Sequence, residues 1–402
     1  MSRLPRPRLS LSRAVPTGAV IAVGAVLAGT MLASASAPDL PRQTPAQLLA
    51  AMRHVKLPTA MTATLSESAN LGLPAIPAIG GLSSSPLSLA SLVSGTHTIE
   101  IWSAGPRQIR IALPVSFGET DLRVNGNQVW LWDSGGQTAT HFLPPAANRY
   151  MIPGGGAPGL TPMPMTPIQI VRRLLALVRP TTQVTVPGTT VVAGRDAYQL
   201  AIAPRSAQSL VGRIMIAVDA RTHLPLSVAV YARGSSSPAF RIGFTSLSFA
   251  RPARSNFAFT PPPGAHVKTV RLPGYAPGAI PDPSRLMGGR LAGVRTFGAG
   301  WLTVADIPVG PVTKFASGKA AAFGVGSAVV RPQQRPGQLG MLGLLLKTAK
   351  PVHGSWGSGR LLTTSLLSVL VTSDGTVLAG AVTPDTLYAD AAQLTAQHAR
   401  AG

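Results

Sequence analysis

The residues that could perform acid–base, nucleophilic or metal chemistry are few and widely spaced. The chain of 402 residues contains 13 Asp and Glu, seven His and no Cys. No two His are four residues apart and no His-Glu-x-x-His motif occurs, so we expect no zinc site. Acidic residues this sparse do not indicate the paired carboxylates of a glycosidase, and no phosphate-binding loop is present. We therefore predict a non-catalytic protein without a metal or a cofactor.

One segment near the C-terminus partly resembles a nucleophile site. Ser355 and Ser358 lie in the Gly-rich segment 354–359, directly after His353. A serine activated by a histidine is the nucleophile of many hydrolases. The spacing differs from the Gly-x-Ser-x-Gly elbow, however, and a Gly-rich turn before a strand explains the same residues. An exported serine hydrolase that uses Ser355 or Ser358 with a distant His is thus the least favoured of three functional hypotheses.

The N-terminus has the features of an export signal. Four arginines among the first 13 residues precede an uncharged run over 14–37 that ends in alternating Ala and Ser. A basic start, an apolar centre and an A-x-A end are typical of a secretory signal peptide. The run is also long enough to cross a bilayer, which leaves an uncleaved anchor with its basic end inside as the alternative. In both cases the remaining chain lies outside the cytoplasm, either secreted or anchored to the cytoplasmic membrane.

The chain is strongly basic. Its 35 Lys and Arg against 13 Asp and Glu give a net charge of +22, and +18 remains without the four N-terminal arginines. Such a charge favours attraction to an anionic membrane surface. The Ala, Gly, Pro and Arg content of proteins from GC-rich genomes would produce the same charge without a partner. Nucleic-acid binding is not expected, because only Arg172 and Arg173 are adjacent and no basic stripe is interleaved with aromatic residues.

The pattern of apolar residues predicts a body made mainly of strands. Helices are expected over 44–55 and 166–178, each beginning with Thr-Pro. The dipeptide Asn125–Gly126, between two alternating runs, predicts a hairpin. About ten antiparallel strands are expected, and twelve segments show the strand pattern: 61–68, 97–102, 108–113, 121–124, 128–133, 138–143, 183–186, 190–202, 212–219, 224–231, 239–249 and 257–264.

Several of these strands are apolar on both faces. In 212–219, Ile214 and Ile216 point to one face while Met215 and Ala217 point to the other. An antiparallel sheet with one face in water should instead alternate apolar with polar residues. One face can be the ordinary core. The other face must therefore meet helices, a second domain or an apolar ligand.

A smaller unit is expected after the strand-rich body. The segment 269–298 is rich in Pro and Gly and is interpreted as a linker. Beyond it, 299–402 contains a predicted strand at 300–309, a short helix within 337–350, a hairpin around Asp374–Gly375 and a final helix that begins at a third Thr-Pro.

The order of these elements resembles a known family. A helix, the hairpin 121–133, the helix 166–178, the strand–turn–strand segment 213–226 and the late segment 257–264 are similar to the bacterial lipoprotein-carrier (LolA-like) superfamily. That group includes the sensor domain of RseB-type regulators and the lipid-carrier lipoproteins of mycobacteria. The tail resembles the C-terminal extension of actinobacterial members.

This resemblance implies an α+β fold. Residues 40–268 would form a large curved antiparallel sheet, an unclosed half β-barrel lidded by helices, and 299–402 a small C-terminal α+β unit. Residues 1–37 would be the signal peptide or membrane anchor. The concave face of the sheet would hold acyl chains or a lipidated peptide, and the inserts 72–94 and 144–164 would open as lids.

The predicted function is the binding of lipid acyl chains or lipidated proteins by a carrier at the cell envelope, with an anionic membrane surface and an envelope protein as further partners. The alternative is a membrane-tethered sensor or regulator that binds a partner protein through the same fold. The sequence does not show which face is concave. The residues predicted to line the cavity are Ile99, Ile101, Ile109, Ile111, Val129, Leu131, Ile214, Ile216, Val228 and Phe244.

Overall fold

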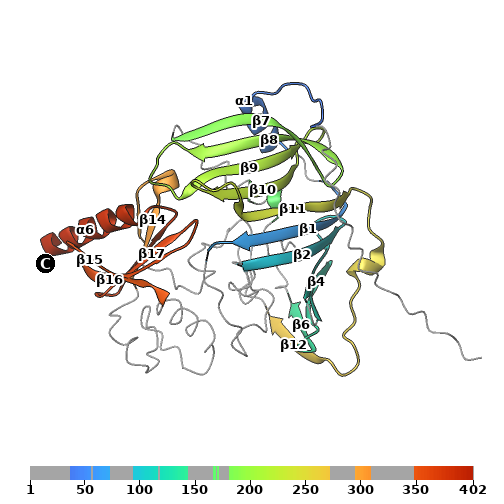
Figure 1. Cartoon of the computed structure of the whole chain (residues 1–402). Helices are drawn as coiled ribbons and strands as arrows, with labels where there is room; N and C mark the ends of the chain where they lie inside the picture. Colours follow the sequence, from blue (N-terminus) through green and yellow to red (C-terminus); the bar gives the residue numbers. More distant parts are fainter. Residues whose placement is uncertain are drawn as a thin grey trace, which may run out of the picture. The chain divides into compact units, whose positions relative to one another are not determined.

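The structure is a computed structural model (Figure 1). It describes residues 37–55, 58–72, 94–115, 118–143, 166–168, 170–171, 181–271, 295–308 and 348–401. The predicted signal or anchor, almost all of the two predicted lid inserts, most of the predicted helix 166–178 and nearly all of 337–350 lie outside these residues. No helix of the described residues is both long and apolar enough to cross a membrane.

Twelve strands form one sheet. They are β1 (Met61–Asn70), β2 (Ser94–Ser103), β3 (Gln108–Val115), β4 (Gly118–Asn125), β5 (Gln128–Asp133), β6 (Thr138–Leu143), β7 (Thr182–Val192), β8 (Arg195–Pro204), β9 (Val211–Asp219), β10 (Pro225–Ala232), β11 (Pro238–Ser248) and β12 (His266–Arg271). Their order is β12-β6-β5-β4-β3-β2-β1-β11-β10-β9-β8-β7. The sheet is unclosed, since β12 and β7 stand at its two edges (Figure 1).

The sheet is mixed, not purely antiparallel as predicted. Strand β12 runs parallel to β6, whereas the other neighbouring pairs are antiparallel. The predicted strand 257–264 was also wrong. This segment contains the end of a 3₁₀ turn, η1 (Arg254–Phe257), followed by an extended stretch without ladder pairing. Its three consecutive prolines, Pro261 to Pro263, lack the N–H groups that a ladder needs. The strand follows them, as β12.

Local turn chemistry explains where most strands end. The β4–β5 hairpin at Asn125–Gly126 is confirmed, and Gly126 has φ +64°, a conformation that glycine adopts without strain. The prediction of one strand over 190–202 was wrong, because the chain turns between β7 and β8. Ala193 and Gly194 both have positive φ, +51° and +71°, as the two central residues of a type I′ turn require. Alanine rarely adopts this conformation, so the turn has a weak sequence signal.

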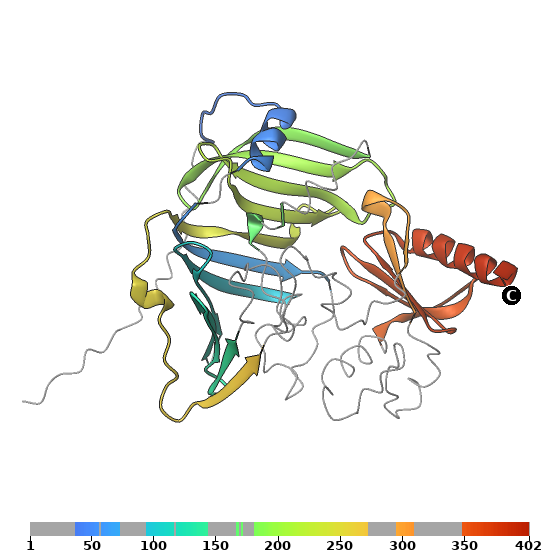
Figure 2. The same cartoon turned by 180° about the vertical axis from the view of Figure 1, so that it is seen from behind.

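Helices contribute less than the predicted α+β class implies, and the fold is mostly β. The predicted first helix is confirmed as α1 (Pro45–Arg53). It begins in a capping box, in which the Thr44 hydroxyl accepts a bond from the Gln47 N–H and the Gln47 side chain accepts one from the Thr44 N–H. Helix α1 lies against β7 (Figure 2). Within the described residues, the α-helical contribution to the large sheet's core comes from α1 and from residues 168, 170 and 171, so a lid of α-helices is supported to that extent alone.

A second sheet has six antiparallel strands in the order β13-β14-β18-β17-β16-β15. Its elements are β13 (Arg295–Phe297), η2 (Gly300–Leu302), β14 (Val304–Pro308), β15 (Lys350–Gly354), β16 (Gly357–Thr363), β17 (Ser368–Thr372), β18 (Thr376–Gly380) and α6 (Pro384–Ala401). Leu387 and Leu394 of α6 pack with Leu370 and Leu378 in one core cluster. The hairpin at Asp374–Gly375 and the final helix are thus confirmed.

Hydrogen bonds connect the two sheets. The N–H of Leu210 donates to the carbonyl of Ala381 at 2.9 Å, and the N–H of Thr383 donates to Gln208 at 2.8 Å. The indole N–H of Trp301 donates to the Thr182 hydroxyl at 2.8 Å. The division into an N-terminal body, a linker at 269–298 and a C-terminal unit stays a prediction.

The turn between β9 and β10 is organised by one buried carboxylate, Asp219. One of its oxygens accepts bonds from the N–H of Arg221 and from the N–H and hydroxyl of Thr222, and the other accepts a bond from Arg195 Nε. Burial raises the pKa of Asp219, but these hydrogen bonds lower it by more, so the net pKa lies below its ordinary value. The ionised carboxylate therefore stabilises the folded chain.

We predict that Asp219→Asn lowers the free energy of unfolding at pH 7 by about 1.5–3 kcal/mol, the contribution of a hydrogen bond to a charged group. Because the folded pKa is depressed, the stabilisation is fully present above the ordinary pKa near 4 and is lost as the pH falls through the folded pKa. Urea unfolding from pH 7 to pH 3 should show the gap between the two proteins narrowing. The exposed neighbour Asp196→Asn is the control, and an equal loss in both variants would contradict the assignment.

Candidate functional site

The strand registers place all ten predicted lining residues on one face of the large sheet. Leu65 on the central strand β1 pairs with both Ile99 and Phe244. From these, directly opposed pairs follow the same face outward in both directions. Towards β5, the paired residues are Ile101, Ile111, Leu122 and Leu131, and Ile109 and Val129 lie on the same face two residues from Ile111 and Leu131. Towards β9, they are Ile242, Val228 and Ile216, and Ile214 lies two residues from Ile216. We call this side the apolar face.

Coverage of the apolar face differs along the sheet. Leu48 and Met52 of α1, with Ile168 and Val171, belong to one core cluster with residues of β1 to β3 and β8 to β11, in which Ile216 is 0% exposed. Seven of the ten predicted residues belong to or pack against this large cluster: Ile99, Ile101, Ile111, Ile214, Ile216, Val228 and Phe244.

The remaining three predicted residues belong to a separate cluster on β3 to β6. In the part of the chain that the structure describes, this cluster consists of strand residues alone. Val129 is buried, while Ile109 and Leu131 are only partly buried. We call this the strand-only patch, and its members are Ile109, Leu122, Val124, Val129, Leu131 and Phe142. That the ten residues line a ligand cavity stays a prediction.

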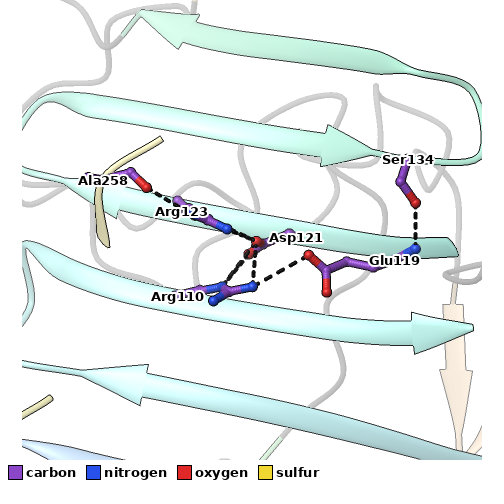
Figure 3. Close-up of polar contacts among 6 residues, drawn as sticks. All are labelled: Arg110, Glu119, Asp121, Arg123, Ser134 and Ala258. Carbon is purple, nitrogen blue, oxygen red and sulfur yellow. Dashed lines mark hydrogen bonds and ion pairs between the residues drawn. The ribbon is translucent and has the colours of Figure 1, made fainter. Parts of the chain in front are cut away.

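The opposite face of the same strands carries a group of charges that the sequence analysis did not single out (Figure 3). Asp121 is 0% exposed and accepts bonds from Arg110 Nε at 3.0 and 3.1 Å and from Arg123 Nε at 2.8 Å. Arg110 also reaches Glu119 at 3.4 Å. Two cations thus balance two carboxylates, as a buried charge requires. The sequence contained an indication of this charged group, because Asp121 and Arg123 are two residues apart on β4 and therefore share a face.

These charges help to hold the segment after β11 against the sheet. Arg123 Nη1 donates to the carbonyl of Ala258 at 2.6 Å (Figure 3). Its guanidinium lies 5.3 Å from the Phe259 ring. The Phe259 ring also contacts Trp130 and Trp132, at centroid distances of 5.5 and 6.1 Å. Packing explains both tryptophans, so only the Val129 and Leu131 side of this hairpin remains as a candidate for ligand contact.

A buried carboxylic acid lies within the apolar face. Glu67 lies on β1 two residues after Leu65, and in register it stands opposite His97 on β2 and Ile242 on β11. Its residue is 5% exposed, and within the described residues its Oε2 atom has no hydrogen-bond partner. Burial raises the pKa of Glu67, and the charge of His97 acts in the opposite direction. The sequence already indicated that Glu67 lies on the apolar face, since in the alternating segment 61–68 it has the same parity as Ala63 and Leu65.

The serine candidates lie in a turn. Gly354 on β15 pairs with Gly357 on β16, so Ser355 and Trp356 form the tip of a hairpin. Ser358 Oγ lies 3.3 Å from Ser373 Oγ, and His353 is the ladder neighbour of Ser358. The Gly-rich turn before a strand is therefore the arrangement found.

No family model and no curated protein matches the chain. Among solved structures, a complex of Pseudomonas aeruginosa MucA and MucB matches at 19% identity and TM-score 0.35, over 86% of this chain and 94% of that chain. A LolA superfamily protein from Nitrosomonas europaea matches at 8% identity and TM-score 0.22, over 54% and 99%. The Mycobacterium tuberculosis lipoprotein LppX matches at 10% identity and TM-score 0.26, over 49% and 92%.

These structures carry the names of the group that the sequence resembles. Their TM-scores all lie below 0.5, so the likenesses add no argument about what this chain binds. The features that bear on function are the apolar face, its strand-only patch and Glu67.

We predict that Glu67→Gln makes the folded chain more stable than the wild type at neutral pH. Because the folded pKa of Glu67 is raised, the wild type loses stability as the pH rises from the ordinary value near 4.3 through the folded pKa. The Gln variant lacks this loss. Thermal unfolding from pH 4 to pH 8 should therefore show the variant's advantage appearing as the pH rises, whereas a constant or reversed difference would contradict an unpaired buried carboxyl.

Proposed function

We propose that this chain is an exported, non-catalytic protein that binds the acyl chains of a lipid or a lipidated protein on its apolar face, in a carrier role at the cell envelope. One observation carries the proposal. Register pairs carry the apolar face from β8 to β6, but within the described residues α1 and residues 168 and 171 belong to the core cluster of only part of it.

The strand-only patch is the region we expect the acyl chain to contact first. A position that is already filled by core packing, such as Ile216 at 0% exposure, has no free surface to offer. Ile109 and Leu131 are only partly buried, so a ligand can still remove apolar surface from water there. Each methylene buried by the protein contributes about 0.8 kcal/mol, which makes a long chain a sufficient source of affinity without any directed polar contact.

Charge supports a location next to a membrane. The net charge of +22 favours approach to anionic headgroups, from which an acyl ligand would be taken or to which it would be delivered.

A second candidate function, a sensor that binds a partner protein, is favoured by a different observation. All six residues of the edge strand β12 are exposed, with Val267 at 54% and Val270 at 37%. An open strand edge can pair with an extended segment of another chain.

The strand-only patch can be tested with a pair of substitutions on one strand. Leu131→Asp places a charge on the apolar face of β5, and we expect it to weaken binding of a fluorescent C16 fatty-acyl probe at least tenfold, because the charge would be desolvated by the chain. Gln128→Asp places the same charge at an exposed position of the opposite parity, and its affinity should stay within twofold of the wild type.

Both variants must retain the circular dichroism spectrum and cooperative unfolding of the wild type. Equal probe affinity in Leu131→Asp and the wild type would remove the strand-only patch from the proposal. Absence of binding by the wild type, with capture of an extended peptide along β12, would favour the sensor function.

A further inference from the structure

We propose that Glu67 is the polar anchor of the ligand: its carboxyl accepts a hydrogen bond from a hydroxyl or amide N–H near the head of an acyl chain. This inference rests on the proposed function and names the ligand class more narrowly. The ligand would be an acyl lipid with a hydrogen-bond donor next to its chain, such as a monoacylglycerol or an N-acylated group, in preference to a lipid without one.

The Glu67 side chain is buried among largely apolar neighbours. Glu67 is 5% exposed, and its in-register neighbour on β11, Ile242, is apolar, as are Leu65 and Ala69 two residues away along β1. Buried polar atoms in proteins are nearly always hydrogen-bonded, so an oxygen without a partner requires a specific explanation. Within the described part of the chain, Oε2 has none.

The other buried carboxylates of the same sheet, Asp121 and Asp219, have partners. Asp121 is held by Arg110 and Arg123, and Asp219 by Arg195 and the turn that follows it. Both therefore have complete structural roles. Glu67 has no arginine in its two register positions, where His97 and Ile242 stand, and it points to the face proposed to meet the ligand. A residue kept only for stability would be better replaced there by an apolar one.

Glu67 lies on the same face as the strand-only patch, but in a different row of paired residues. Leu131 lies in the row of Ala63, through Leu122, Ile111 and Ile101. Ala63 is four residues from Glu67 along β1, or about 13 Å at the rise of a strand, and β5 is four strands away, or about 19 Å. Glu67 and the patch thus mark opposite corners of one continuous apolar surface. Because Glu67 and Ile101 are each only 5% exposed, the ligand must displace side chains packed over them, and a head group at Glu67 then directs an extended chain towards Leu131.

The test uses the full exported chain and two probes with the same C16 chain, 1-monopalmitoylglycerol and methyl palmitate. The first carries hydroxyl donors at its head and the second carries none. Competition against a fluorescent fatty-acyl probe, below the aggregation limit of each lipid, gives the ratio of their affinities. We expect the wild type to prefer the monoacylglycerol about tenfold, as one hydrogen bond to a charged group predicts.

Glu67→Leu should bind the two probes equally while retaining the affinity of the wild type for methyl palmitate. Glu100→Leu is the matched control, since Glu100 lies on the neighbouring strand with the opposite parity, and it should keep the tenfold preference. Glu67→Gln keeps an acceptor of the same shape without the charge. It should show a reduced preference for the monoacylglycerol. If the Leu variant does not fold, the ratio of the two affinities in the Gln variant tests the anchor instead.

The outcomes separate this inference from the proposed function. Equal binding of the two probes by the wild type, or an unchanged preference in both Glu67 variants, overturns the anchor while acyl binding stands. Failure of the folded wild type to bind either probe overturns the proposed function and the anchor together.

Discussion

The pairing of β1 with both of its neighbours is the interaction on which the rest of the structure depends. Strand β1 joins β2, which follows it along the chain, to β11, which lies almost 180 residues later. Because side chains alternate with a period of two, this double register decides which residues of both halves share a face. A slip of one residue would turn Leu65 away from Ile99 and Phe244 and divide the apolar face into two unrelated halves.

Buried side chains are stabilised differently on the two faces of the sheet. On one side, charges are buried with their partners, as Asp121 is between two arginines, and the aromatic rings of Trp130 and Phe259 close over the same strands. On the other side, apolar residues follow one another in register, and within the described residues the α-helices belong to the core cluster of only part of them. Among the buried carboxylates of this sheet, Asp121 and Asp219 are paired, whereas Glu67 Oε2 has no hydrogen-bond partner within the described residues, and this difference calls for a ligand.

Much of this could be predicted from the sequence, because it depends on local patterns. The strand-rich body, the hairpin at Asn125–Gly126, the Thr-Pro helix starts and the two-faced apolar strands follow from alternation and turn residues. Parity correctly grouped the lining residues within each strand, such as Ile99 with Ile101, whereas the register between strands decides that all ten share one face. The lack of ladder pairing over 257–264 followed from its prolines and was missed. The turn at Ala193–Gly194 was missed because alanine gives little signal for a positive φ.

What the sequence could not provide were the pairings between distant strands. The parallel position of β12 beside β6, the contact of Arg123 with Ala258 and the placement of Glu67 opposite Ile242 are all decided by register between segments far apart in the chain. The role of Asp121 is of the same kind, since an acidic residue in an alternating strand ordinarily faces water, and only the arrival of Arg110 from β3 makes its burial favourable.

The most direct measurement of the central claim is native mass spectrometry of the chain purified from its own secretion or membrane fraction, followed by organic extraction and lipid analysis. A folded protein with a bound acyl lipid that carries a hydroxyl or amide at its head is the result expected. A folded, homogeneous protein with no bound lipid, which also takes up none from vesicles of anionic lipid, would contradict an acyl-binding function.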